Sequence, residues 1–460
     1  MSTNIYTSVI DMIGNTPMFE ARKLNSDPCR LFLKLEGQNP GGSIKDRIGL
    51  SMIEAAEREG KIKPGGTVIE ATAGNTGLGL ALVAAQKGYK MLVVVPDKMS
   101  QEKIFHLTAL GAEVMMTRSD VTKGHPDYYQ DVAEHLSRKI ENSFWVNQFA
   151  NPANPAAHEM TTGPEIWEQT AGEVDAVVCG VGSGGTITGL GRYFRSVKPA
   201  VEMILADPEG SVLAGLVKDG KMGELGSWVV EGIGEDFLPP NCDVDLIAGA
   251  YTITDQESLV TARELLAKEG ILSGSSSGTL VAAALRYCRE QTEPKTVVSL
   301  LPDSGNKYLS KMYNDYWMTD QGFMERPKHG DLRDLIYRPF DDRAVVAASP
   351  DDTLMSAYGR MRMADVSQLP VLKEDRILGI IDESDLLLAL HQNQERFDEP
   401  VANYMIDRLE MLTPAEPLEN LLPILRADRV AIIVDDGHFL GLITKVDFLN
   451  HLRCNALVTG

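Results

Sequence analysis

Short apolar segments alternate with longer, helix-like ones over the first 318 residues of the chain. The apolar segments of strand length are Thr67–Glu70, Lys90–Val95, Asp175–Val181, Val201–Ala206 and Thr296–Leu301. They are nearly continuous apolar runs, as is typical of strands in a parallel sheet with both faces covered. Stretches of helical length, such as Leu78–Lys87 and Ile187–Tyr193, follow glycine-containing turns. The pattern predicts an α/β fold of parallel βαβ units, whose ligands bind at the carboxyl ends of the strands.

The pattern changes after residue 318. Residues 319–336 are polar, show no strand pattern and are predicted to be a linker. Beyond them, Ser349–Leu354 (SPDDTL) recurs as Thr413–Leu418 (TPAEPL), and Leu378–Asp385 (LGIIDESD) recurs as Leu440–Asp447 (LGLITKVD). A tandem duplication explains both recurrences, and each copy reads helix, strand, turn, strand, helix. We therefore expect four parts: 1–318, the linker 319–336, and two repeats, 337–396 and 397–460.

Composition narrows the class of protein. The chain has 460 residues, 43% hydrophobic and 24% charged, as in ordinary globular proteins. Its 65 acidic residues outnumber its 44 basic ones, and the net charge of −21 argues against nucleic acid as a partner, which requires lysine and arginine opposite phosphates. The longest apolar runs fall far short of the ~20 residues that span a bilayer, so we expect no membrane partner. The two repeats are more acidic per residue than the rest of the chain.

The cysteines and the first residues indicate a cytoplasmic protein. None of the five cysteines forms a C-x-x-C pair, which suits reduced thiols. The first residues lack the basic and apolar regions of a signal peptide. The eight histidines are scattered, and His106, His125 and His158 are interpreted as surface or packing residues. We therefore expect no metal site.

Four segments carry candidate chemistry. In Lys34–Ile48 (KLEGQNPGGSIKDRI), Lys45 follows a glycine-rich turn where a helix should begin, and its amine can form a Schiff base with a carbonyl. The alternative is an ordinary surface lysine. In Glu70–Gly79 (EATAGNTGLG), a turn leads into a helix N-terminus that favours an oxyanion, and Asn75 can hold a phenolic oxygen. The alternative is a plain strand-to-helix connection.

The third segment, Gly180–Gly189 (GVGSGGTITG), places successive backbone N–H groups and two hydroxyls at a predicted helix start. These belong to Gly182, Ser183, Gly184, Gly185 and Thr186. The spacing fits neither a Walker A motif nor a dinucleotide motif, and suits a single terminal phosphate. A simple tight turn is the alternative. The fourth segment, Leu272–Gly278 (LSGSSSG), offers a neutral hydroxyl to a ring nitrogen, with a serine- and glycine-rich linker as its alternative.

In this order, the four segments resemble those of the fold type II pyridoxal-phosphate enzymes, the family of tryptophan synthase β and cysteine synthase. The resemblance covers about residues 5–318 and implies two doubly wound α/β lobes. It further implies that Lys45 forms the Schiff base with pyridoxal 5′-phosphate, Asn75 bonds the 3′ oxygen, and Gly182–Thr186 hold the phosphate. Ser276 then faces the pyridine nitrogen. A neutral hydroxyl there leaves the cofactor a weaker electron sink, which favours β-replacement or β-elimination over transamination, with Lys45 as the base for the α-proton.

Within this family, the chain most resembles the cystathionine β-synthases. The features concerned are Glu231–Phe237 (EGIGEDF), Leu301–Ser304 (LPDS) followed by Tyr316–Met318 (YWM), and the duplicated tail. The resemblance implies a carbon–oxygen lyase that condenses L-serine with L-homocysteine to L-cystathionine and water, and releases hydrogen sulfide when cysteine replaces serine. An acid at Glu231 suits the poor hydroxide leaving group of serine; a solvated loop acid is the alternative. A cysteine synthase using O-acetylserine, and a nucleotide-sensing scaffold with an inactive catalytic domain, remain open as other functions.

The same resemblance assigns two further contacts and one absence. Thr72 and Gln148 correspond to residues that grip the substrate carboxylate. Two departures are Phe149, where the animal enzymes have tyrosine, and Ala73, where the family usually has serine. The animal enzymes carry haem on an N-terminal extension. Here the family's opening motif, Met12–Pro17, begins almost at once, so we expect no haem.

The duplicated tail resembles a Bateman module, a pair of CBS motifs that often binds adenosine derivatives. In that family an aspartate after a Gly-x-x-Thr turn holds ribose hydroxyls. The second copy keeps this pattern in Thr444 and Asp447, whereas the first has Asp382 in place of the threonine. The resemblance makes Thr444 and Asp447 candidate nucleotide-binding residues for S-adenosylmethionine, AMP or ATP, with a structural module as the alternative. We also expect a homodimer or a larger homo-oligomer.

Overall fold

The computed structural model describes residues 5–72, 74–97, 101–121, 124–326 and 328–458, so Ala73 lies outside the described residues. Its internal contacts divide the chain into two units, Met1–Tyr313 and Asn314–Gly460. Each unit has its own hydrophobic cores. Among the described residues, no helix combines the length and apolar character needed to cross a membrane.

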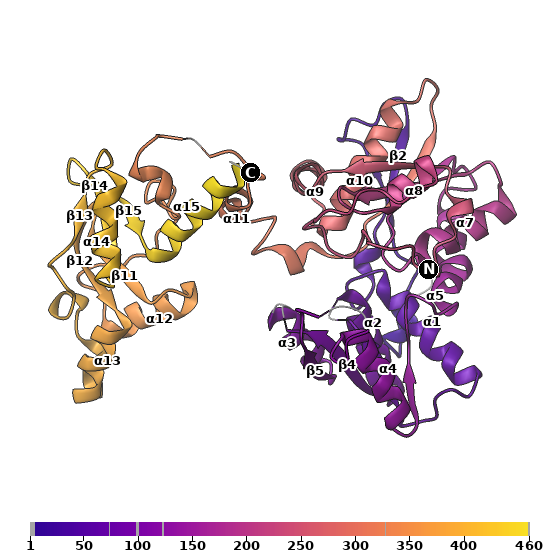
Figure 1. Cartoon of the computed structure of the whole chain (residues 1–460), viewed down its shortest axis with the longest axis horizontal. Helices are drawn as coiled ribbons and strands as arrows, with labels where there is room; N and C mark the ends of the chain where they lie inside the picture. The colour runs from indigo at the N-terminus through magenta and orange to yellow at the C-terminus, as the bar shows by residue number, and fades with distance from the viewer. Residues whose placement is uncertain (1–4, 73, 98–100, 122–123, 327, 459–460) are drawn as a thin grey trace. The chain divides into compact units, whose positions relative to one another are not determined.

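The first unit contains two β-sheets (Figure 1). The larger has the order β1 (Met18–Ala21), β2 (Arg30–Lys34), β10 (Thr296–Leu300), β7 (Ala176–Cys179), β8 (Glu202–Pro208) and β9 (Gly249–Ile253). The smaller has the order β5 (Glu113–Thr117), β4 (Lys90–Pro96), β3 (Thr67–Ala71) and β6 (Ser143–Trp145). All neighbouring strands are parallel except β1, which is antiparallel to β2. The predicted α/β fold is therefore confirmed.

Among the described residues, ten α-helices belong to the first unit. They are α1 (Lys45–Arg58), α2 (Asn75–Lys87), α3 (Gln101–Ala109), α4 (Tyr129–Lys139), α5 (Ala153–Ala157), α6 (Gly163–Gln169), α7 (Gly185–Val197), α8 (Leu213–Asp219), α9 (Asp255–Glu269) and α10 (Ser275–Arg289). The next helix, α11 (Asp315–Asp320), belongs to the second unit. A single π-helical turn, η3 (His158–Thr162), joins α5 to α6.

Helices cover both faces of the smaller sheet. Val68 and Val93 pack in the cluster formed with α1 and α2. Their neighbours Ile69 and Val94 point to the opposite face and pack with Ala133 of α4. Because successive residues of a strand face opposite sides, a strand buried on both sides must be apolar at every position. This is the physical origin of the continuous apolar runs in the sequence.

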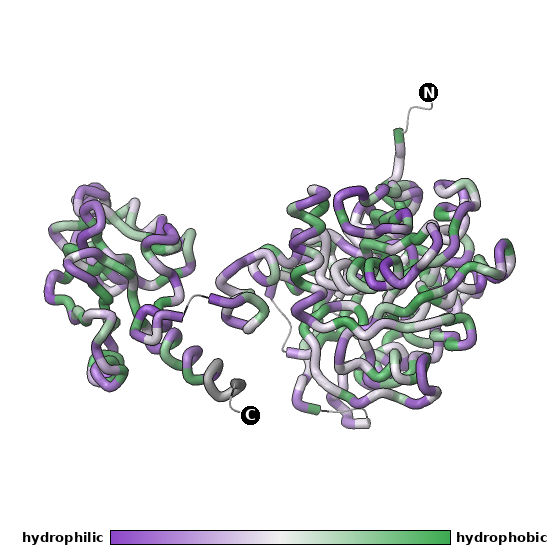
Figure 2. The backbone as a smooth tube through the Cα atoms, turned by 90° about the horizontal axis from the view of Figure 1, so that it is seen from above, coloured by the Kyte–Doolittle hydropathy of each residue, from purple (hydrophilic) through white to green (hydrophobic). Residues whose placement is uncertain are grey.

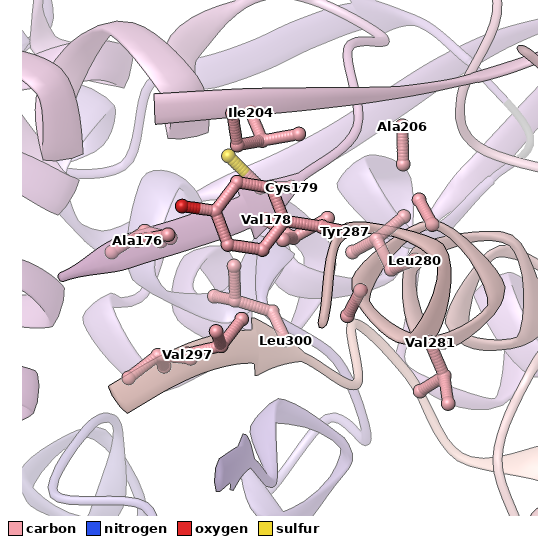
Figure 3. Packing of buried hydrophobic residues seen from close by; sticks show 14 of the residues in the cluster. Ala176, Val178, Cys179, Ile204, Ala206, Leu280, Val281, Tyr287, Val297 and Leu300 are labelled. Carbon is pink, nitrogen blue, oxygen red and sulfur yellow. The ribbon is translucent and has the colours of Figure 1, made fainter. Parts of the chain in front are cut away.

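The larger sheet packs against α10 in the same way. Figure 3 shows Val178 of β7 and Leu300 of β10 in one cluster with Leu280 and Val281 of α10. These four side chains are at most 1% exposed. Replacing one of them by alanine leaves a cavity, which typically costs about 2–5 kcal/mol. The core thus holds the carboxyl ends of β7 and β10, and the start of α10, in fixed positions.

The second unit repeats one motif twice. The first copy comprises α12 (Leu354–Ala364), β11 (Gln368–Lys373), β12 (Arg376–Asp382) and α13 (Glu383–Gln392). The second comprises β13 (Met411–Leu412), α14 (Leu421–Arg426), β14 (Ala431–Asp435), β15 (His438–Ile443) and α15 (Lys445–Val458). The hairpins β11–β12 and β14–β15 are antiparallel. Figure 2 shows the corresponding alternation of hydrophobic and hydrophilic stretches along the backbone.

The segment expected to be a linker is partly structured. Its last residues form a short 3-10 helix, Leu332–Leu335. Leu332, Leu335 and Ile336 are buried with Leu421 and Ile443 of the second copy. In the sequence, the apolar residues of this segment are interspersed with polar ones. They therefore show neither the alternation of a strand nor the spacing of an α-helix.

Candidate active site

The segments that follow strands β2, β3, β7 and β10 line one pocket. It contains every residue predicted to hold the cofactor: Lys45, Asn75, Gly182, Ser183, Gly184, Gly185, Thr186 and Ser276. Lys45 lies in the first connection after β2, Asn75 follows β3, and Gly182–Thr186 follow β7. This is the carboxyl edge of the sheets, where ligands of open α/β folds bind.

Lys45 is the first residue of α1, and its backbone N–H donates to Ser43 Oγ at 3.2 Å. Burial lowers the pKa of its amine, although the nearby carboxyl groups of Glu235 and Asp303 partly oppose this. A buried amine loses hydration of its charged form, so the neutral nucleophilic form becomes accessible. The site thus supplies the amine that a Schiff base requires.

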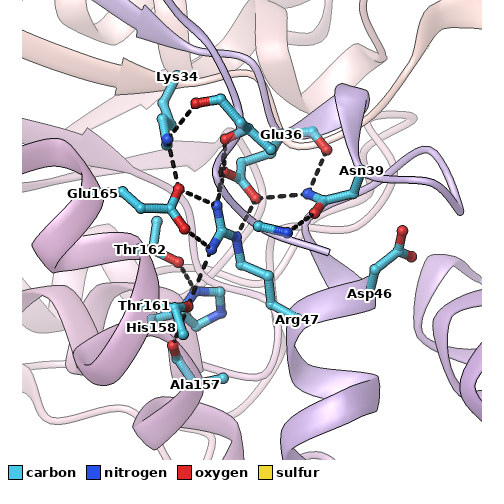
Figure 4. Close-up of polar contacts among 12 residues, drawn as sticks. Lys34, Glu36, Asn39, Asp46, Arg47, Ala157, His158, Thr161, Thr162 and Glu165 are labelled. Atoms are coloured by element: carbon cyan, nitrogen blue, oxygen red, sulfur yellow. Dashed lines mark hydrogen bonds and ion pairs between the residues drawn. The ribbon is translucent and has the colours of Figure 1, made fainter. Parts of the chain in front are cut away.

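A buried ionic network holds the first turn of α1 (Figure 4). Arg47 lies two residues after Lys45 and binds Glu36 through Nε and Nη2 at 2.7 and 2.8 Å. The same guanidinium binds Glu165 through Nη1 and Nη2, both at 2.7 Å. Lys34 Nζ also donates to Glu165, at 2.7 Å. Burial opposes the charge of Glu165, but Arg47 and Lys34 prevail and lower its pKa to about 2. The network fixes the backbone that carries Lys45.

The loop between β7 and α7 forms a cradle for an anion. Gly184, the residue before α7, has a φ of +81°, which favours glycine. A Cβ on Gly185 would lie 1.9 Å from Asn154 Oδ1. Asn154 in turn donates from Nδ2 to Ser183 Oγ at 2.9 Å and to the Gln148 carbonyl at 2.8 Å. The absence of side chains leaves the backbone N–H groups of the α7 N-terminus open to the pocket, which suits one phosphate group.

A buried histidine supports the last residue of the cradle. Thr186 Oγ1 and His158 Nε2 are hydrogen-bonded at 3.2 Å, and His158 Nδ1 is hydrogen-bonded to Thr162 Oγ1 at 3.0 Å. Burial, followed by the charges of Lys45 and Arg47, holds the pKa of His158 well below its ordinary value. The ring is therefore neutral and orients the Thr186 hydroxyl. Sequence reasoning missed this contact, because His158 lies on a different element with no motif around it.

Asn75 is held by two residues from the far end of the first unit. Its Nδ2 donates to Asp303 Oδ2 at 2.9 Å, and its Oδ1 accepts a hydrogen bond from Lys307. Asp303 also accepts from the Tyr308 hydroxyl at 2.9 Å. Burial raises the pKa of Asp303, while the hydrogen bond from Asn75 opposes the rise. The LPDS motif was noted in the sequence, but its pairing with Asn75 could not be predicted from it.

Ser276 lies in the first turn of α10 and is 4% exposed. Beside it, the pocket is lined by Leu280 and Leu300. The N-terminus of a 15-residue helix carries a partial positive charge, which disfavours a second positive charge nearby. A ring nitrogen placed beside Ser276 would therefore meet a neutral hydroxyl and no carboxylate of that helix.

A second pocket adjoins the first and shares Lys45 with it. It is lined by both residues predicted to bind the substrate carboxylate, Thr72 and Gln148, and by Phe149. Gln148 Oε1 accepts from Thr76 Oγ1 at 2.7 Å, and the backbone N–H of Gln148 donates to Glu70 Oε2 at 3.0 Å. These bonds fix the loop, so an amino acid bound here would lie against the Lys45 amine.

Glu231 lines the first pocket, but its carboxylate is paired. Lys103 Nζ donates to Glu231 Oε2 at 2.6 Å, and Lys311 Nζ donates to Oε1 at 2.7 Å. Burial would raise its pKa, but the two lysines lower it overall. An ionised carboxylate of this kind can balance charge and is poorly suited to donating a proton. Neither lysine was identified from the sequence.

In the second unit, Thr444 and Asp447 bond to each other at the start of α15. The Thr444 N–H and Oγ1 both donate to Asp447 Oδ2, at 2.7 and 2.6 Å. The first copy has the same cap, in which the Asp385 N–H donates to Asp382 Oδ1 at 2.9 Å. Both pairs stabilise a helix N-terminus. Their arrangement is thus explained by helix capping, and their contact with a nucleotide stays a prediction.

Pyridoxal phosphate fits the residues present. The glycine cradle accommodates a phosphate, Lys45 supplies the amine, and Ser276 supplies a neutral partner for the ring nitrogen. Among the residues that the structure describes, no group of three or more histidine, cysteine, aspartate or glutamate side chains could hold a metal ion.

Comparison with protein families agrees with this geometry. A model described as pyridoxal-phosphate dependent enzyme matches residues 9–303, and a CBS domain model matches residues 338–392 and 401–454. The chain is 36% identical to cystathionine beta-synthase of Apis mellifera over 470 residues, which cover 98% of this chain and 92% of that protein. It is 38% identical to the enzyme of Mus musculus over 445 residues, covering 95% and 79%. It is 33% identical to that of Saccharomyces cerevisiae over 500 residues, covering 97% of each.

Two solved structures resemble the first unit. A hydrogen sulfide-producing enzyme from Fusobacterium nucleatum is 37% identical with a TM-score of 0.61, covering 66% of this chain and 98% of that one. O-ureido-L-serine synthase is 33% identical with a TM-score of 0.63, covering 68% and 99%.

Proposed function

Because this chain belongs to the cystathionine beta-synthase family of pyridoxal-phosphate-dependent enzymes, we propose that it condenses L-serine with L-homocysteine to give L-cystathionine and water. The observation that carries the proposal is the meeting of two pockets at Lys45, one suited to the cofactor and one to an amino acid. The family match includes both the catalytic region and the two CBS domains.

The residues of the first pocket would hold the cofactor. The N–H groups of Gly182–Thr186 would bind its phosphate, Asn75 would bond its 3′ oxygen, and Ser276 would face its ring nitrogen. When bound, pyridoxal phosphate withdraws electrons from the α-carbon of an attached amino acid, so that the α-proton and the β-substituent can leave. The neutral Ser276 limits this withdrawal and favours β-replacement over transamination.

The chain's own groups then position serine and move its α-proton. Thr72 and Gln148 orient the substrate carboxylate in the second pocket. The Lys45 amine takes the proton from the α-carbon and later returns it. Glu231, held by Lys103 and Lys311, balances charge beside the reacting groups.

Cysteine is a second donor in this proposal. Its thiol replaces the hydroxyl of serine as the leaving group, and the product is hydrogen sulfide. The similarity of the first unit to a hydrogen sulfide-producing enzyme supports this extension.

The test is a substrate-pair assay on the purified holoenzyme. We expect serine with homocysteine, and cysteine with homocysteine, to be turned over faster than O-acetylserine with sulfide. Much faster turnover of O-acetylserine with sulfide would make the chain a cysteine synthase instead. No turnover of any pair, with the cofactor bound, would support the nucleotide-sensing scaffold.

For the second unit, we propose an adenosine-type ligand bound near Thr444 and Asp447. The CBS domain matches support this class of ligand. Calorimetry with S-adenosylmethionine, AMP and ATP separates the candidates, and the variant Asp447→Asn should weaken whichever binds. Absence of heat with all three ligands would favour a structural module.

Three further properties stay predictions. We propose that the protein is cytoplasmic, which its free buried cysteines Cys29, Cys179, Cys242 and Cys288 support. A homodimer or larger homo-oligomer is proposed and is tested by light scattering. Absence of haem is tested by the visible spectrum, in which a Soret band would contradict it.

A further inference from the structure

Glu235 is a carboxyl group of the substrate pocket that the mechanism above does not use. It lines this pocket together with Lys45, Thr72 and Gln148. Its backbone is fixed, because the Glu235 N–H donates to Ser211 Oγ at 3.1 Å and its carbonyl accepts from the Val212 N–H at 3.1 Å. The side chain therefore extends from a rigid loop toward the pocket.

The direction of the side chain follows from the glycine beside it. A Cβ built on Gly182 would lie 4.0 Å from Glu235 Oε1, so the carboxyl group lies over the start of the phosphate cradle. Among the hydrogen bonds and ion pairs of the described residues, none involves this carboxyl group. It is half-buried, open to the pocket and free to bond with a bound molecule.

Burial and the nearby carboxyl groups favour the protonated form of Glu235. Burial is the largest cause, followed by the carboxylate of Asp236, and together they raise the pKa of Glu235 to about 8 against the opposing charge of Lys45. Asp207, at the end of β8, adds to the rise. Among the described residues, the phenols of Tyr128 and Tyr129 are also coupled to Glu235, and they carry no charge at neutral pH. A phosphate in the adjacent cradle would add negative charge and raise the pKa further.

Two acids on one loop are therefore in opposite states. Glu231 is paired with two lysines and its pKa is lowered. Glu235, four residues later, is unpaired and its pKa is raised. When the pKa values of two neighbouring carboxyl groups differ in this way, the group with the raised pKa is suited to proton donation.

We propose that Glu235 is the catalytic acid that protonates the β-hydroxyl of serine as it leaves, and the base that then accepts the proton of the incoming thiol. This proposal rests on the proposed function and deepens it. The Cβ–O bond breaks and water forms with the Glu235 proton, which leaves Glu235 as a carboxylate. The thiol S–H bond then breaks, its proton passes to Glu235, and sulfur forms the new bond to Cβ. Protons balance over the cycle, and Lys45 handles only the α-proton.

The kinetic test compares two leaving groups in a single turnover without homocysteine. Serine must lose hydroxide, which needs a proton, whereas O-acetylserine loses acetate, which does not. In Glu235→Gln we expect release from serine to slow by about 100-fold, in the range typical of general acid catalysis, and release from O-acetylserine to change by less than about threefold. The matched control is Glu224→Gln, an exposed acid that lines neither pocket, which should stay near wild type with both substrates.

Equal slowing of both substrates in Glu235→Gln would overturn the inference, because it would indicate a structural role. No slowing of either would overturn it as well. If the wild-type enzyme releases acetate but never water, the proposed function itself fails, and the inference fails with it.

A second readout does not depend on turnover. The infrared difference between wild type and Glu235→Gln isolates the carboxyl absorption of this residue, with or without cofactor. We expect a protonated-carboxyl band that disappears as the pH rises through about 8 without cofactor, and at a higher pH with it. A band already absent at pH 6 would show an ionised Glu235 and overturn the role of acid.

Discussion

At the scale of single residues, the chemistry depends on the state of each group more than on its identity. Lys45 and Glu231 were both identified from the sequence, and both line the first pocket. Burial favours the neutral form of the Lys45 amine, whereas two lysines keep Glu231 ionised. Residue type and spacing predict where a group lies, but its protonation follows from neighbours that only the fold supplies.

Replacement of Lys45 by alanine should abolish Schiff base formation without unfolding the protein. We expect the visible absorbance of the bound cofactor to be lost and turnover to fall by roughly 1,000-fold or more. Absorbance spectroscopy measures the first effect and the substrate-pair assay the second. The control is an unchanged thermal unfolding midpoint of the cofactor-free protein. Retention of the absorbance band in Lys45→Ala would mean that another amine binds the cofactor.

At the scale of elements, the strands and the glycine-rich turns could be predicted, and their partners could not. Thr67–Glu70 and Thr296–Leu301 correspond to β3 and β10 within one residue, because burial on both faces leaves a continuous apolar run. The contacts that complete the site join distant segments, as in Lys103 with Glu231, 128 residues apart. No local period records such a pairing, so Lys103, Asp303 and His158 were not assigned to the site.

The cradle before α7 should not tolerate a side chain at Gly185. A Cβ there would lie 1.9 Å from Asn154 Oδ1, and Asn154 is held in place by its own hydrogen bonds. In Gly185→Ala we expect the affinity for pyridoxal phosphate to fall by about 10- to 100-fold, or 1.4–2.8 kcal/mol. A fluorescence titration of the cofactor-free protein measures it. The matched control is Gly359→Ala in α12, where a Cβ meets nothing within 4 Å.

The first turn of α1 should depend on the network of Arg47. In Glu165→Gln the guanidinium loses one of two carboxylate partners, and Lys34 loses its ion pair. Removing one partner of a buried ion pair typically costs about 3–5 kcal/mol. We expect a lower thermal unfolding midpoint, measured by calorimetry, together with weaker cofactor absorbance because Lys45 shares the turn. A midpoint equal to that of wild type would show that the network contributes no net stability.

At the scale of the whole molecule, three acids with raised pKa values link stability to pH. Burial is the main cause that raises the pKa of Asp46 and Glu70 to about 7 and of Glu235 to about 8. In the unfolded chain these groups ionise at ordinary values. Between the ordinary pKa values and the raised ones, the folded protein therefore binds more protons than the unfolded chain. The stability that these groups contribute is fully present below the ordinary pKa values and is lost as the pH rises through 7–8.

We therefore expect the cofactor-free protein to unfold at a lower temperature at pH 9 than at pH 6. Each of the three groups contributes at most about 1.4 kcal/mol per pH unit within its window. Calorimetry across this range measures the trend, and Glu70→Gln should flatten it by removing one titrating group. A midpoint that rises with pH over the same range would contradict the prediction.

The sequence predicts the fold of the first unit more completely than that of the second. The α/β fold and the duplicated tail follow from apolar runs and from repetition, which are properties of the chain itself. The burial of Leu332 and Leu335 in the core of the second copy was not anticipated, because a short 3-10 helix leaves no period in the sequence. The exact boundaries of the catalytic region, the linker and the two repeats stay predictions.

The bond between Asn75 and Asp303 joins residues 228 positions apart and has a consequence for protein synthesis. At translation rates of roughly 5–20 residues per second, Asp303 leaves the ribosome on the order of 10–50 s after Asn75. By then the smaller sheet, which ends at Trp145, has emerged in full. In a nascent chain stalled before residue 303, that sheet would already be packed. The first pocket, around Lys45, would be incomplete, and Asn75 would lack its hydrogen-bond acceptor Asp303.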